Sequence, residues 1–306
     1  RGFALHPGLA AMLQHEAVLF VDRAGRELAN AIKWSHIVHL QNASPDVAAL
    51  AKFFGKPIVL TIHNYMRPKW NLHRLLWRIS ARLADECWYN SDFVWQTWEG
   101  NHKRRGSRKV PTASKLPQGW ISPNQRRGFV FVGRWIANKG IETLVDAYAQ
   151  AEIDRAAWPL VLIGDGPLRP AIEHKIEKYG LRDVQIAGFV NEATKADRMK
   201  NARWVVVPPH TNEDFGLAAI EARNLGVPCI ITRDGGLPEA GGRQALVCEP
   251  GDPRALANLL ERVTHMSDAE YVDRSNRTRE ELQHELVPMD FYAQSYRRIL
   301  CSDPAE

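Results

Sequence analysis

Two glutamates, Glu213 and Glu221, flank the start of a predicted helix, where their carboxylates could accept hydrogen bonds from the hydroxyl groups of a ligand. The apolar run Trp204–Val207 predicts a buried strand that ends at two prolines, and the helix opens near Phe215 and Gly216. The free backbone N–H groups of that helix start favour an anion such as a diphosphate. This arrangement indicates a site for a nucleotide sugar, although one glutamate could instead serve only the helix dipole or the solvent.

Cationic residues follow another predicted strand and could bind the same diphosphate. The apolar run Phe129–Val132 is followed by Gly133 and Arg134, and Lys139 stands at the start of the next predicted helix. Arginine offers a bidentate fork of donors and lysine a compact point charge, and both suit a diphosphate. We therefore expect Arg134 and Lys139 to bind an anionic ligand.

Glycine-containing turns end two more of the predicted strands. After Leu160–Ile163 comes a turn with Gly164 and Gly166, where backbone could approach a flat base closely. A later strand ends just before Val190, which offers an apolar contact. Glycine after a strand is ordinary turn chemistry, so each signal is weak alone. Their joint occurrence at strand ends, around the two glutamates, predicts one binding site.

The second half of the chain predicts a sheet that brings these strand ends together. Apolar runs alternate with helical patterns, which is typical of a parallel sheet with helices on both faces. Six strands are predicted, at residues 129–132, 160–163, 184–187, 204–207, 229–232 and 245–248. Helices fill the gaps, at residues 140–151, 167–179, 192–201, 215–225 and 253–265. Doubly wound domains of this kind bind ligands at the carboxyl ends of their strands.

The first half predicts another α/β domain with a similar alternation. Strands are expected at residues 17–21, 37–40, 57–63 and 87–89, and helices at 45–54, at 70–84 and from about 91. The basic run at residues 102–109 is interpreted as a solvated loop. A polar stretch at 121–127 predicts the domain boundary, so we divide the chain into residues 1–126, 127–287 and 288–306. A polar helix is expected through Arg279, and a last helix at 291–300 carries an apolar stripe that must pack on something.

Five motifs in the second half together resemble the donor domain of family 4 retaining glycosyltransferases of the GT-B fold. In chain order they are GRWIANKG, LIGDGP, GFV, EDFGLAAIEARNLGVPCI and DGGLPE, and the resemblance covers about residues 128–265. The first half is similar to the acceptor domain of that family only in outline. The resemblance implies two Rossmann-like domains facing a cleft, with the last helix crossing back onto the first domain.

The resemblance also implies a role for each matched position. Arg134 and Lys139 would hold the donor diphosphate, and Glu221 would bind the ribose hydroxyls. Glu213 would lie near the transferred sugar, and His63 would reach that sugar from the first domain. Backbone contacts would come from Gly133, Phe215, Gly216 and Leu217, and the base would be bordered by Gly164, Gly166 and Val190. His63 could instead be an ordinary hydrogen-bonded histidine near a strand end, which is how we interpret His36, His39 and His73.

Family members of this type need no divalent metal, and the sequence contains no Asp-x-Asp triad. We therefore expect no cofactor and no metal. The resemblance implies a nucleotide-diphosphate sugar as donor and a glycan or a lipid-linked molecule as acceptor, as in polysaccharide or glycolipid biosynthesis. It also implies same-face attack, with the leaving phosphate taking the proton of the acceptor.

The charge of the chain is distributed unevenly and bears on its partners. Residues 1–126 contain 18 Lys and Arg against 8 Asp and Glu, whereas the formal net charge of all 306 residues is only +5. Four basic residues on one predicted helix, Lys69, Arg74, Arg78 and Arg82, stand beside the apolar residues Trp70, Leu76, Trp77 and Leu83. Such a face could bind an anionic membrane surface, or it could be a solvated face over an ordinary core. Aromatic spacing in this region is helical, so nucleic-acid binding is not expected.

No apolar run approaches the length of a membrane span, and no secretory signal stands at the start. The four cysteines have no paired spacing, so we expect buried, reduced thiols in a cytoplasmic protein, peripheral to the membrane if the basic face binds it.

One departure from the family pattern concerns the amino-terminal end. The family's acceptor domain opens with a strand and a glycine-rich loop, and nothing of that kind precedes residues 17–21. We therefore expect the first domain to be shortened there, by truncation or by divergence. The alternative to an active enzyme is accordingly a non-catalytic module that binds a nucleotide sugar, or an inactive fragment.

Overall fold

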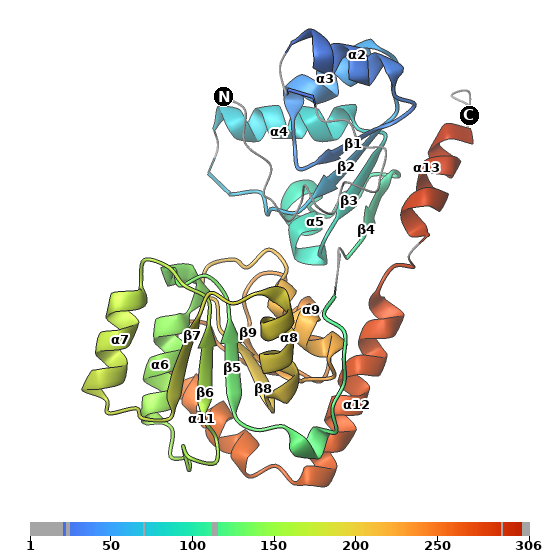
Figure 1. Ribbon diagram of the computed structural model, residues 1–306. Helices are drawn as coiled ribbons and strands as arrows, with labels where there is room; N and C mark the ends of the chain where they lie inside the picture. The colour runs from blue at the N-terminus through green and yellow to red at the C-terminus, as the bar shows by residue number, and fades with distance from the viewer. Residues whose placement is uncertain (1–20, 23–24, 70, 112–115, 289, 302–306) are drawn as a thin grey trace.

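The computed structural model describes residues 21–22, 25–69, 71–111, 116–288 and 290–301. Within these ranges, two parallel sheets with helices form two α/β domains, which Figure 1 shows one above the other. The strand predicted at 17–21 lies outside the described residues except for its last position. The segment on which the expected shortening of the first domain depends lies outside them as well.

The second domain is built on a six-stranded parallel sheet with the strand order β10-β9-β8-β5-β6-β7. Its strands are β5 (Phe129–Val132), β6 (Leu160–Ile163), β7 (Val184–Gly188), β8 (Trp204–Val207), β9 (Cys229–Thr232) and β10 (Leu246–Cys248). The chain starts in the middle at β5, proceeds outward to β7, and then returns to β8 beside β5. The strand order therefore reverses between β5 and β8, and such a switch point is where doubly wound sheets bind ligands.

Both faces of the middle of this sheet are buried, which explains why β5, β6 and β8 are continuous apolar runs. Phe129 and Phe131 of β5 pack in a core on one face with residues of α6 (Ile141–Gln150) and α11 (Pro253–Thr264). Val130, between them, packs on the other face with residues of α9 (Leu217–Asn224). Alternate side chains of a strand point to opposite faces, so a strand that is covered on both sides has no polar position.

The helices of the second domain lie in the gaps between its strands, as predicted. They are α6 (Ile141–Gln150), α7 (Arg169–Lys178), α8 (Glu192–Asn201), α9 (Leu217–Asn224), α10 (Leu237–Gly241), α11 (Pro253–Thr264) and α12 (Asp268–Glu285), with the 3-10 turns η1 (Pro123–Gln125) and η2 (Ala137–Lys139). The short helix α10 was not predicted, because Gly235 and Gly236 precede it and its second residue is Pro238. Helix α12 continues beyond Arg279, where the polar helix was expected to end.

The first domain contains a four-stranded parallel sheet with the order β1-β2-β3-β4. Its strands are β1 (Val38–Gln41), β2 (Ile58–Ile62), β3 (Glu86–Tyr89) and β4 (Ser107–Lys109), and its helices are α2 (Arg26–Trp34), α3 (Pro45–Phe53), α4 (Leu72–Leu83) and α5 (Asp92–Glu99). Helix α2 was not predicted. The core on one face of the sheet contains residues from β1, β2 and β3 together with α2–α5.

We expected the basic run at residues 102–109 to be a loop, but its last three residues form the edge strand β4. Ser107–Lys109 pairs with β3 in parallel register. Arg104, before the strand, donates a hydrogen bond of 2.8 Å to the carbonyl oxygen of Ala84. Edge strands are often rich in basic residues, since charge discourages further pairing, and such a strand is difficult to distinguish from a loop by composition.

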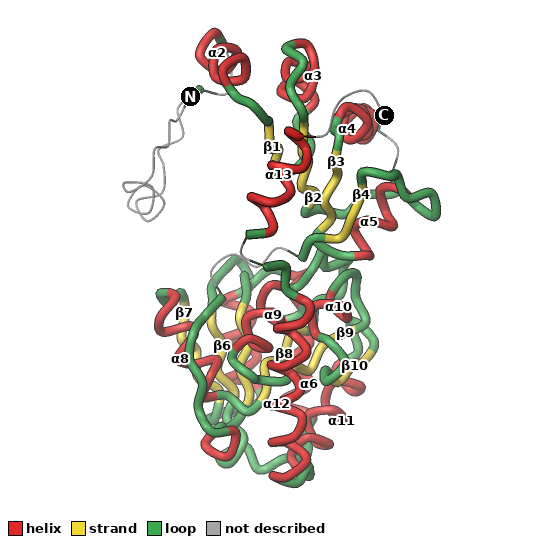
Figure 2. Tube along the Cα trace, turned by 90° about the vertical axis from the view of Figure 1, so that its right-hand side faces the viewer, coloured by secondary structure: helices red, strands yellow, loops and turns green. Residues whose placement is uncertain are grey.

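The last helix, α13 (Phe291–Cys301), covers the other face of the first sheet (Figure 2). Tyr296 stacks on the fully buried Trp88 of β3, with ring centroids 6.1 Å apart and planes at 14°. Arg298 donates a hydrogen bond of 2.7 Å to the carboxylate of Glu86. The apolar stripe of this helix is therefore part of the core of the first domain. The preceding described element of that domain, β4, ends at Lys109, and α13 starts at Phe291.

Residues 116–126 pack on the second domain, although the predicted division of the chain assigns them to the first. Leu116 contacts the core on the α9 face of the sheet. Arg126 is buried and donates hydrogen bonds to the carbonyl oxygens of Leu225 and Gly226 and to the hydroxyl of Ser275. The composition of this stretch is polar because one buried guanidinium and a 3-10 turn anchor it, with few apolar contacts.

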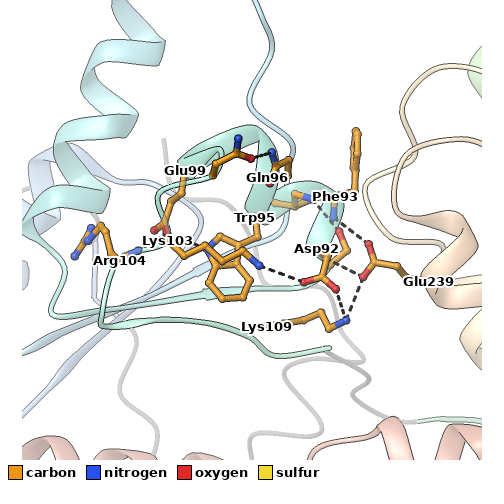
Figure 3. Close-up of polar contacts among 12 residues, drawn as sticks. Asp92, Phe93, Trp95, Gln96, Glu99, Lys103, Arg104, Lys109 and Glu239 are labelled. Atoms are coloured by element: carbon orange, nitrogen blue, oxygen red, sulfur yellow. Dashed lines mark hydrogen bonds and ion pairs between the residues drawn. The ribbon is translucent and has the colours of Figure 1, made fainter.

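A carboxylate of the second domain caps a helix of the first (Figure 3). Glu239 of α10 accepts hydrogen bonds from the backbone N–H groups of Asp92 and Phe93, at 2.8 and 2.9 Å, at the start of α5. Lys109 forms ion pairs with both Asp92 and Glu239, at 2.6 and 3.4 Å. These contacts satisfy free donors of a helix start across the domain interface.

The cysteines follow the prediction only in part. Cys87, Cys229 and Cys248 are buried free thiols, whereas Cys301 at the end of α13 is exposed. In the part of the chain that the structure describes, no helix is both long enough and apolar enough to cross a membrane.

Candidate functional site

A cleft of about 850 Å³ lies between the two domains, at the carboxyl ends of β5 and β8. Most of the residues predicted for the site line it: His63, Gly133, Arg134, Lys139, Glu213, Phe215, Gly216, Leu217 and Glu221. The first domain and α13 supply His39, Gln41, Asn64, Asn90, Tyr292 and Tyr296. The site therefore lies at the switch point of the second sheet, opposite strand ends of the first.

Lys139 and Glu213 form an ion pair inside the cleft. Lys139 Nζ lies 2.5 Å from Glu213 Oε2, and the two side chains are 25% and 15% exposed. Gly140, directly after Lys139, has a φ of 69°, and a Cβ there would lie 1.7 Å from the carbonyl oxygen of Pro208. Only glycine allows this approach, so the loop after β5 is held against the loop after β8.

The motif DGGLPE holds the loop that carries Glu213. The carboxylate of Asp234 accepts hydrogen bonds of 2.8 Å from the backbone N–H groups of Asn212 and Glu213. Gly236 N donates to the carbonyl oxygen of Glu213 at 2.8 Å, and a Cβ on Gly235 would lie 2.1 Å from that oxygen. The motif that the resemblance marks thus fixes the backbone on which Glu213 stands.

Glu221 stands in a different ion pair, with a lysine that sequence reasoning missed. Lys195 of α8 lies 2.9 Å from Glu221 Oε1 and 2.7 Å from Glu192, and its side chain is 14% exposed. Burial disfavours the charge of Lys195, but hydrogen bonds to Glu192 and Glu221 prevail and raise its pKa. The carboxylate of Glu221, on the second turn of α9, is thereby held by a lysine of the neighbouring helix α8.

The helix start between these two carboxylates has no side-chain cap. Gly216 precedes α9 with a φ of 103°, and no side chain accepts a hydrogen bond from the first turn. Leu217, the first residue of α9, is 58% exposed in the cleft. Uncapped N–H groups with a helix dipole behind them favour an anion, and anion binding at this position stays a prediction.

Arg134 completes the cationic side of the cleft. It is exposed at the end of β5, and among the residues that the structure describes it has no ion-pair partner. Its guanidinium is therefore available to an anion, whereas Lys139 already neutralises Glu213.

His63, at the end of β2, belongs to a hydrogen-bonded chain of side chains. Its Nε2 lies 2.8 Å from Gln41 Oε1, and Gln41 Nε2 lies 3.3 Å from His39 Nε2. His39 in turn contacts Thr61 at 2.7 Å and Tyr296 of α13 at 2.5 Å. Burial lowers the pKa of His63, and it lowers the pKa of His39 to about 4, with His63 as a second cause. His39 is thus a hydrogen-bonded histidine, as interpreted, and both rings are neutral near pH 7.

Gly164, Gly166 and Val190, expected to border a base, do not line the cleft. A Cβ on Gly164 would lie 1.9 Å from the carbonyl oxygen of Gly133, and one on Gly166 would lie 2.5 Å from that of Trp135. Both glycines let two neighbouring loops of the protein pack closely. Val190 packs against the core beside α9.

Asp214 is a second residue that sequence reasoning did not single out. Its Oδ1 accepts a hydrogen bond of 2.6 Å from Tyr65 N, and its carbonyl oxygen accepts one of 2.8 Å from Ser91 Oγ. Burial raises the pKa of its carboxyl group. Its place between Glu213 and Phe215 was the available signal, because a loop that carries one site residue usually presents its neighbours.

In the described part of the chain, no group of three or more His, Cys, Asp and Glu side chains could hold a metal ion. Carboxylates in the cleft contact lysines instead, as the pairs of Glu213 and Glu221 show.

Two comparisons with known structures concern the fold. A structure of Anabaena Alr3699/HepE in complex with UDP superposes with a TM-score of 0.73 at 16% identity, over 89% of this chain and 81% of that one. A glycosyltransferase from Rickettsia africae superposes with a TM-score of 0.78 at 16% identity, over 96% and 88% of the two chains. The fold is GT-B, with two Rossmann-like domains, as the sequence predicted.

Sequence relatives point the same way. The uncharacterized glycosyltransferase YqgM of Bacillus subtilis is 25% identical over 278 residues, which are 85% of this chain and 77% of that protein. The 2-deoxystreptamine N-acetyl-D-glucosaminyltransferase of Niallia circulans is 30% identical over 232 residues, which are 74% of this chain and 54% of that enzyme. A family profile described as "Glycosyl transferases group 1" matches residues 114–281, more than half of the chain. The chain is therefore a member of the group 1 glycosyl transferases.

Proposed function

We propose that this glycosyltransferase is a retaining, metal-independent enzyme of the family 4 type, which transfers a hexosyl group from a nucleotide-diphosphate sugar. The observation that carries the proposal is the convergence, in one cleft, of Arg134, Lys139 and the uncapped start of α9. These groups would bind the diphosphate, since guanidinium, ammonium and helix N-termini all favour phosphate oxygens. Structures of Anabaena Alr3699/HepE were determined with UDP and with UDP-glucose, which supports a donor of this class.

The carboxylates would bind the donor's hydroxyl groups. Glu221, oriented by Lys195, would accept hydrogen bonds from the ribose. Glu213 would lie near the transferred sugar, where its negative charge stabilises the positive charge that develops on the ring. The diphosphate would compete with Glu213 for Lys139. Donor binding would therefore leave the negative charge of Glu213 less neutralised by the lysine.

His63 would contact the transferred sugar from the first domain. Because its pKa is lowered by burial, the ring is neutral and can donate or accept a hydrogen bond to a sugar hydroxyl. Its bond to Gln41 fixes the ring orientation. Gly164, Gly166 and Val190 would act on the base only by shaping the loops behind the cleft.

The transfer step would proceed on one face of the sugar. The acceptor oxygen forms a bond to the anomeric carbon while the bond from that carbon to the phosphate oxygen breaks. The acceptor proton passes to the departing phosphate, so no protein base is needed and the anomeric configuration is kept. Arg134, Lys139 and the start of α9 would neutralise the leaving diphosphate in place of a metal.

The acceptor would be a glycan or a lipid-linked molecule, and the first domain would bring it to the cleft. We propose a cytoplasmic enzyme that is peripheral to an anionic membrane. On α4, Leu72, Leu75 and Ile79 are exposed, with the basic Arg78 and Arg82 beside them. Of the apolar residues expected on this face, Trp77 and Leu83 pack in the core instead, Leu76 is half-buried, and Trp70 lies outside the described residues.

A panel of nucleotide sugars, screened by thermal shift, tests the donor, because a ligand of the native state raises the melting temperature. The selected donor is then incubated with an acceptor mixture, and nuclear magnetic resonance of the first-formed product reads the anomeric configuration. Inversion, or activity that is lost on chelation and restored by manganese or magnesium, would contradict the proposed mechanism. Donor binding without transfer or slow hydrolysis would favour the alternative of a non-catalytic binding module.

A further inference from the structure

A second cavity, of about 520 Å³, opens beside the cleft and shares Asn64 and Asp214 with it. Residues 64–67, 69 and 71, which follow β2, and the first turns of α4 line it together with Asp214. We propose that this cavity binds the acceptor and that the acceptor carries a phosphate group. The inference rests on the proposed function and names the substrate class of the acceptor side of the same site.

The charge of the cavity is strongly positive. Arg67, Lys69, His73 and Arg74 line it, and Asp214 is the only acidic residue among its lining residues. Arg67, Lys69 and His73 are exposed, and none forms an ion pair within the described ranges. Basic side chains that converge on one cavity without carboxylate partners attract a multiply charged anion.

Arg74 adds a fixed positive charge to the wall. Its Nη1 donates a hydrogen bond of 2.6 Å to the carbonyl oxygen of Pro68, which holds the guanidinium in place. The positive charge of this guanidinium therefore stays at the wall of the cavity, where it attracts an anion.

The donor diphosphate does not account for this cluster. Arg134, Lys139 and the start of α9 belong to the second domain and line the cleft, but none of them lines the second cavity. The four basic residues belong to the first domain, on the acceptor side. They therefore provide a separate anion site.

Asp214 lines both cavities and would orient the acceptor between them. Its Oδ1 is occupied by the N–H of Tyr65, which leaves the other carboxylate oxygen for a hydroxyl group of the acceptor. An acceptor with its phosphate among Lys69, His73 and Arg74 would thus present a hydroxyl group beside Asp214, next to the transferred sugar. Asp214 is a positioning residue in this arrangement.

The phosphate could belong to a soluble sugar phosphate or to a phospholipid headgroup, and one titration series distinguishes them. Wild-type protein is first saturated with the nucleoside diphosphate found in the donor screen, so that the donor site is filled. Inorganic phosphate, glucose 6-phosphate, and phosphatidylcholine vesicles with and without phosphatidylglycerol are then titrated. Binding of glucose 6-phosphate tighter than that of inorganic phosphate assigns the soluble source. Binding of only the phosphatidylglycerol vesicles, when it is displaced by inorganic phosphate and retained in Arg78→Glu plus Arg82→Glu, assigns the lipid source.

A double substitution tests the residues. Arg67→Gln with Lys69→Gln should weaken binding of the phosphate probe at least about tenfold, because two charge-assisted contacts are lost. The matched control, Arg26→Gln with Lys33→Gln, removes two exposed charges of α2 in the same domain and should leave phosphate binding unchanged. Equal affinities of the two double variants for the phosphate probe would overturn the inference. A wild-type protein that binds its nucleoside diphosphate but none of the phosphate probes would also overturn it. Both outcomes would leave the proposed function intact. Failure to bind any nucleotide sugar would instead overturn the proposed function.

Discussion

Glu213 and Glu221 lie on one cleft, but each is held differently. Glu213 stands on a loop, and its partner Lys139 is a residue that the diphosphate would also contact. Glu221 stands on α9, and its partner Lys195 does not line the cleft. Donor binding therefore changes the electrostatic environment of Glu213 more than that of Glu221.

Replacing each glutamate by glutamine should affect different kinetic constants. Glu213→Gln removes a charge close to the breaking bond, so we expect kcat to fall at least tenfold, about 1.4 kcal/mol, with KM little changed. Glu221→Gln should mainly raise KM, since a ribose contact is equal in ground and transition states. Steady-state kinetics and thermal melts measure both. Normal kcat with a lowered melting temperature in Glu213→Gln would reduce that residue to a structural role.

Arg134→Ala and Lys139→Ala should both weaken donor binding or turnover, by roughly 10- to 150-fold, because each removes a charge-assisted hydrogen bond worth about 1.5–3 kcal/mol. Lys139→Ala also leaves Glu213 without its ion-pair partner, so the melting temperature of this variant should fall. The melting temperature of Arg134→Ala should stay at the wild-type value. Calorimetric donor titration and differential scanning calorimetry make the comparison. Wild-type donor affinity in both variants would remove these residues from the site.

The sequence predicted which residues line the cleft where a strand end or a helix start determines the position of the side chain. Arg134, Lys139 and Glu221 are of this kind. It could not predict Lys195, which reaches Glu221 from α8 by side-chain length alone. Gly164 and Gly166 were assigned to a ligand, but the contacts that require glycine there are with Gly133 and Trp135 of the same protein. A glycine pattern does not reveal which backbone comes close.

At the scale of elements, α13 connects to the cleft through His39. Protonation of this ring is unfavourable in the folded protein, where burial and His63 lower its pKa to about 4, against about 6.5 when unfolded. Between these values the unfolded chain binds a proton that the native protein does not. The free energy of unfolding should therefore fall as the pH falls from about 6.5 toward 4, by at most about 1.4 kcal/mol per unit before solvent screening.

Urea unfolding of the wild type at pH 7.5 and pH 5, beside His39→Asn, measures this effect. The variant should show a smaller loss of stability between the two pH values. His174→Asn, an exposed histidine on α7, is the matched control and should follow the wild type. A His39→Asn protein with the wild-type pH dependence would show that other groups cause it.

Helix α4 should bring the protein to anionic membranes through Arg78 and Arg82, since each basic residue near such a surface contributes about 1 kcal/mol. Co-sedimentation with phosphatidylglycerol vesicles should fall with added salt and with Arg78→Glu plus Arg82→Glu. Leu75→Ser with Ile79→Ser should weaken it further, because both side chains are exposed apolar area. Absence of sedimentation at low salt would end this proposal.

The elements with strong apolar runs were predicted closely, and those without them were missed. The bounds of β5, β6, β8 and β9 agree with the prediction, because strands buried on both faces are almost entirely apolar. Strand β4 is a basic edge of three residues, and α10 starts among glycines and a proline. Both owe their structure to neighbours rather than to their own residues.

At the scale of the whole molecule, Glu239 connects the domains, and its removal should loosen the contact between them. Glu239→Ala leaves two N–H groups at the start of α5 without acceptors and Lys109 with only Asp92. We expect a larger radius of gyration in small-angle scattering and a lower kcat/KM. Glu249→Ala, which breaks the exposed pair with Arg233 in the same domain, is the control. Identical scattering curves for Glu239→Ala and wild type would limit Glu239 to local capping.

The position of α13 also has a consequence for the order of events on the ribosome. Among the described residues, much of the cover on the face of the first sheet that bears Trp88 comes from α13, which is translated after every strand that it covers. Residues 116–285, in contrast, contain all the described strands and helices of the second sheet's domain. We therefore expect the second domain to complete its core before the first, which reverses the usual order in which domains fold as they are translated. During that interval the first domain should expose apolar surface that a chaperone could bind.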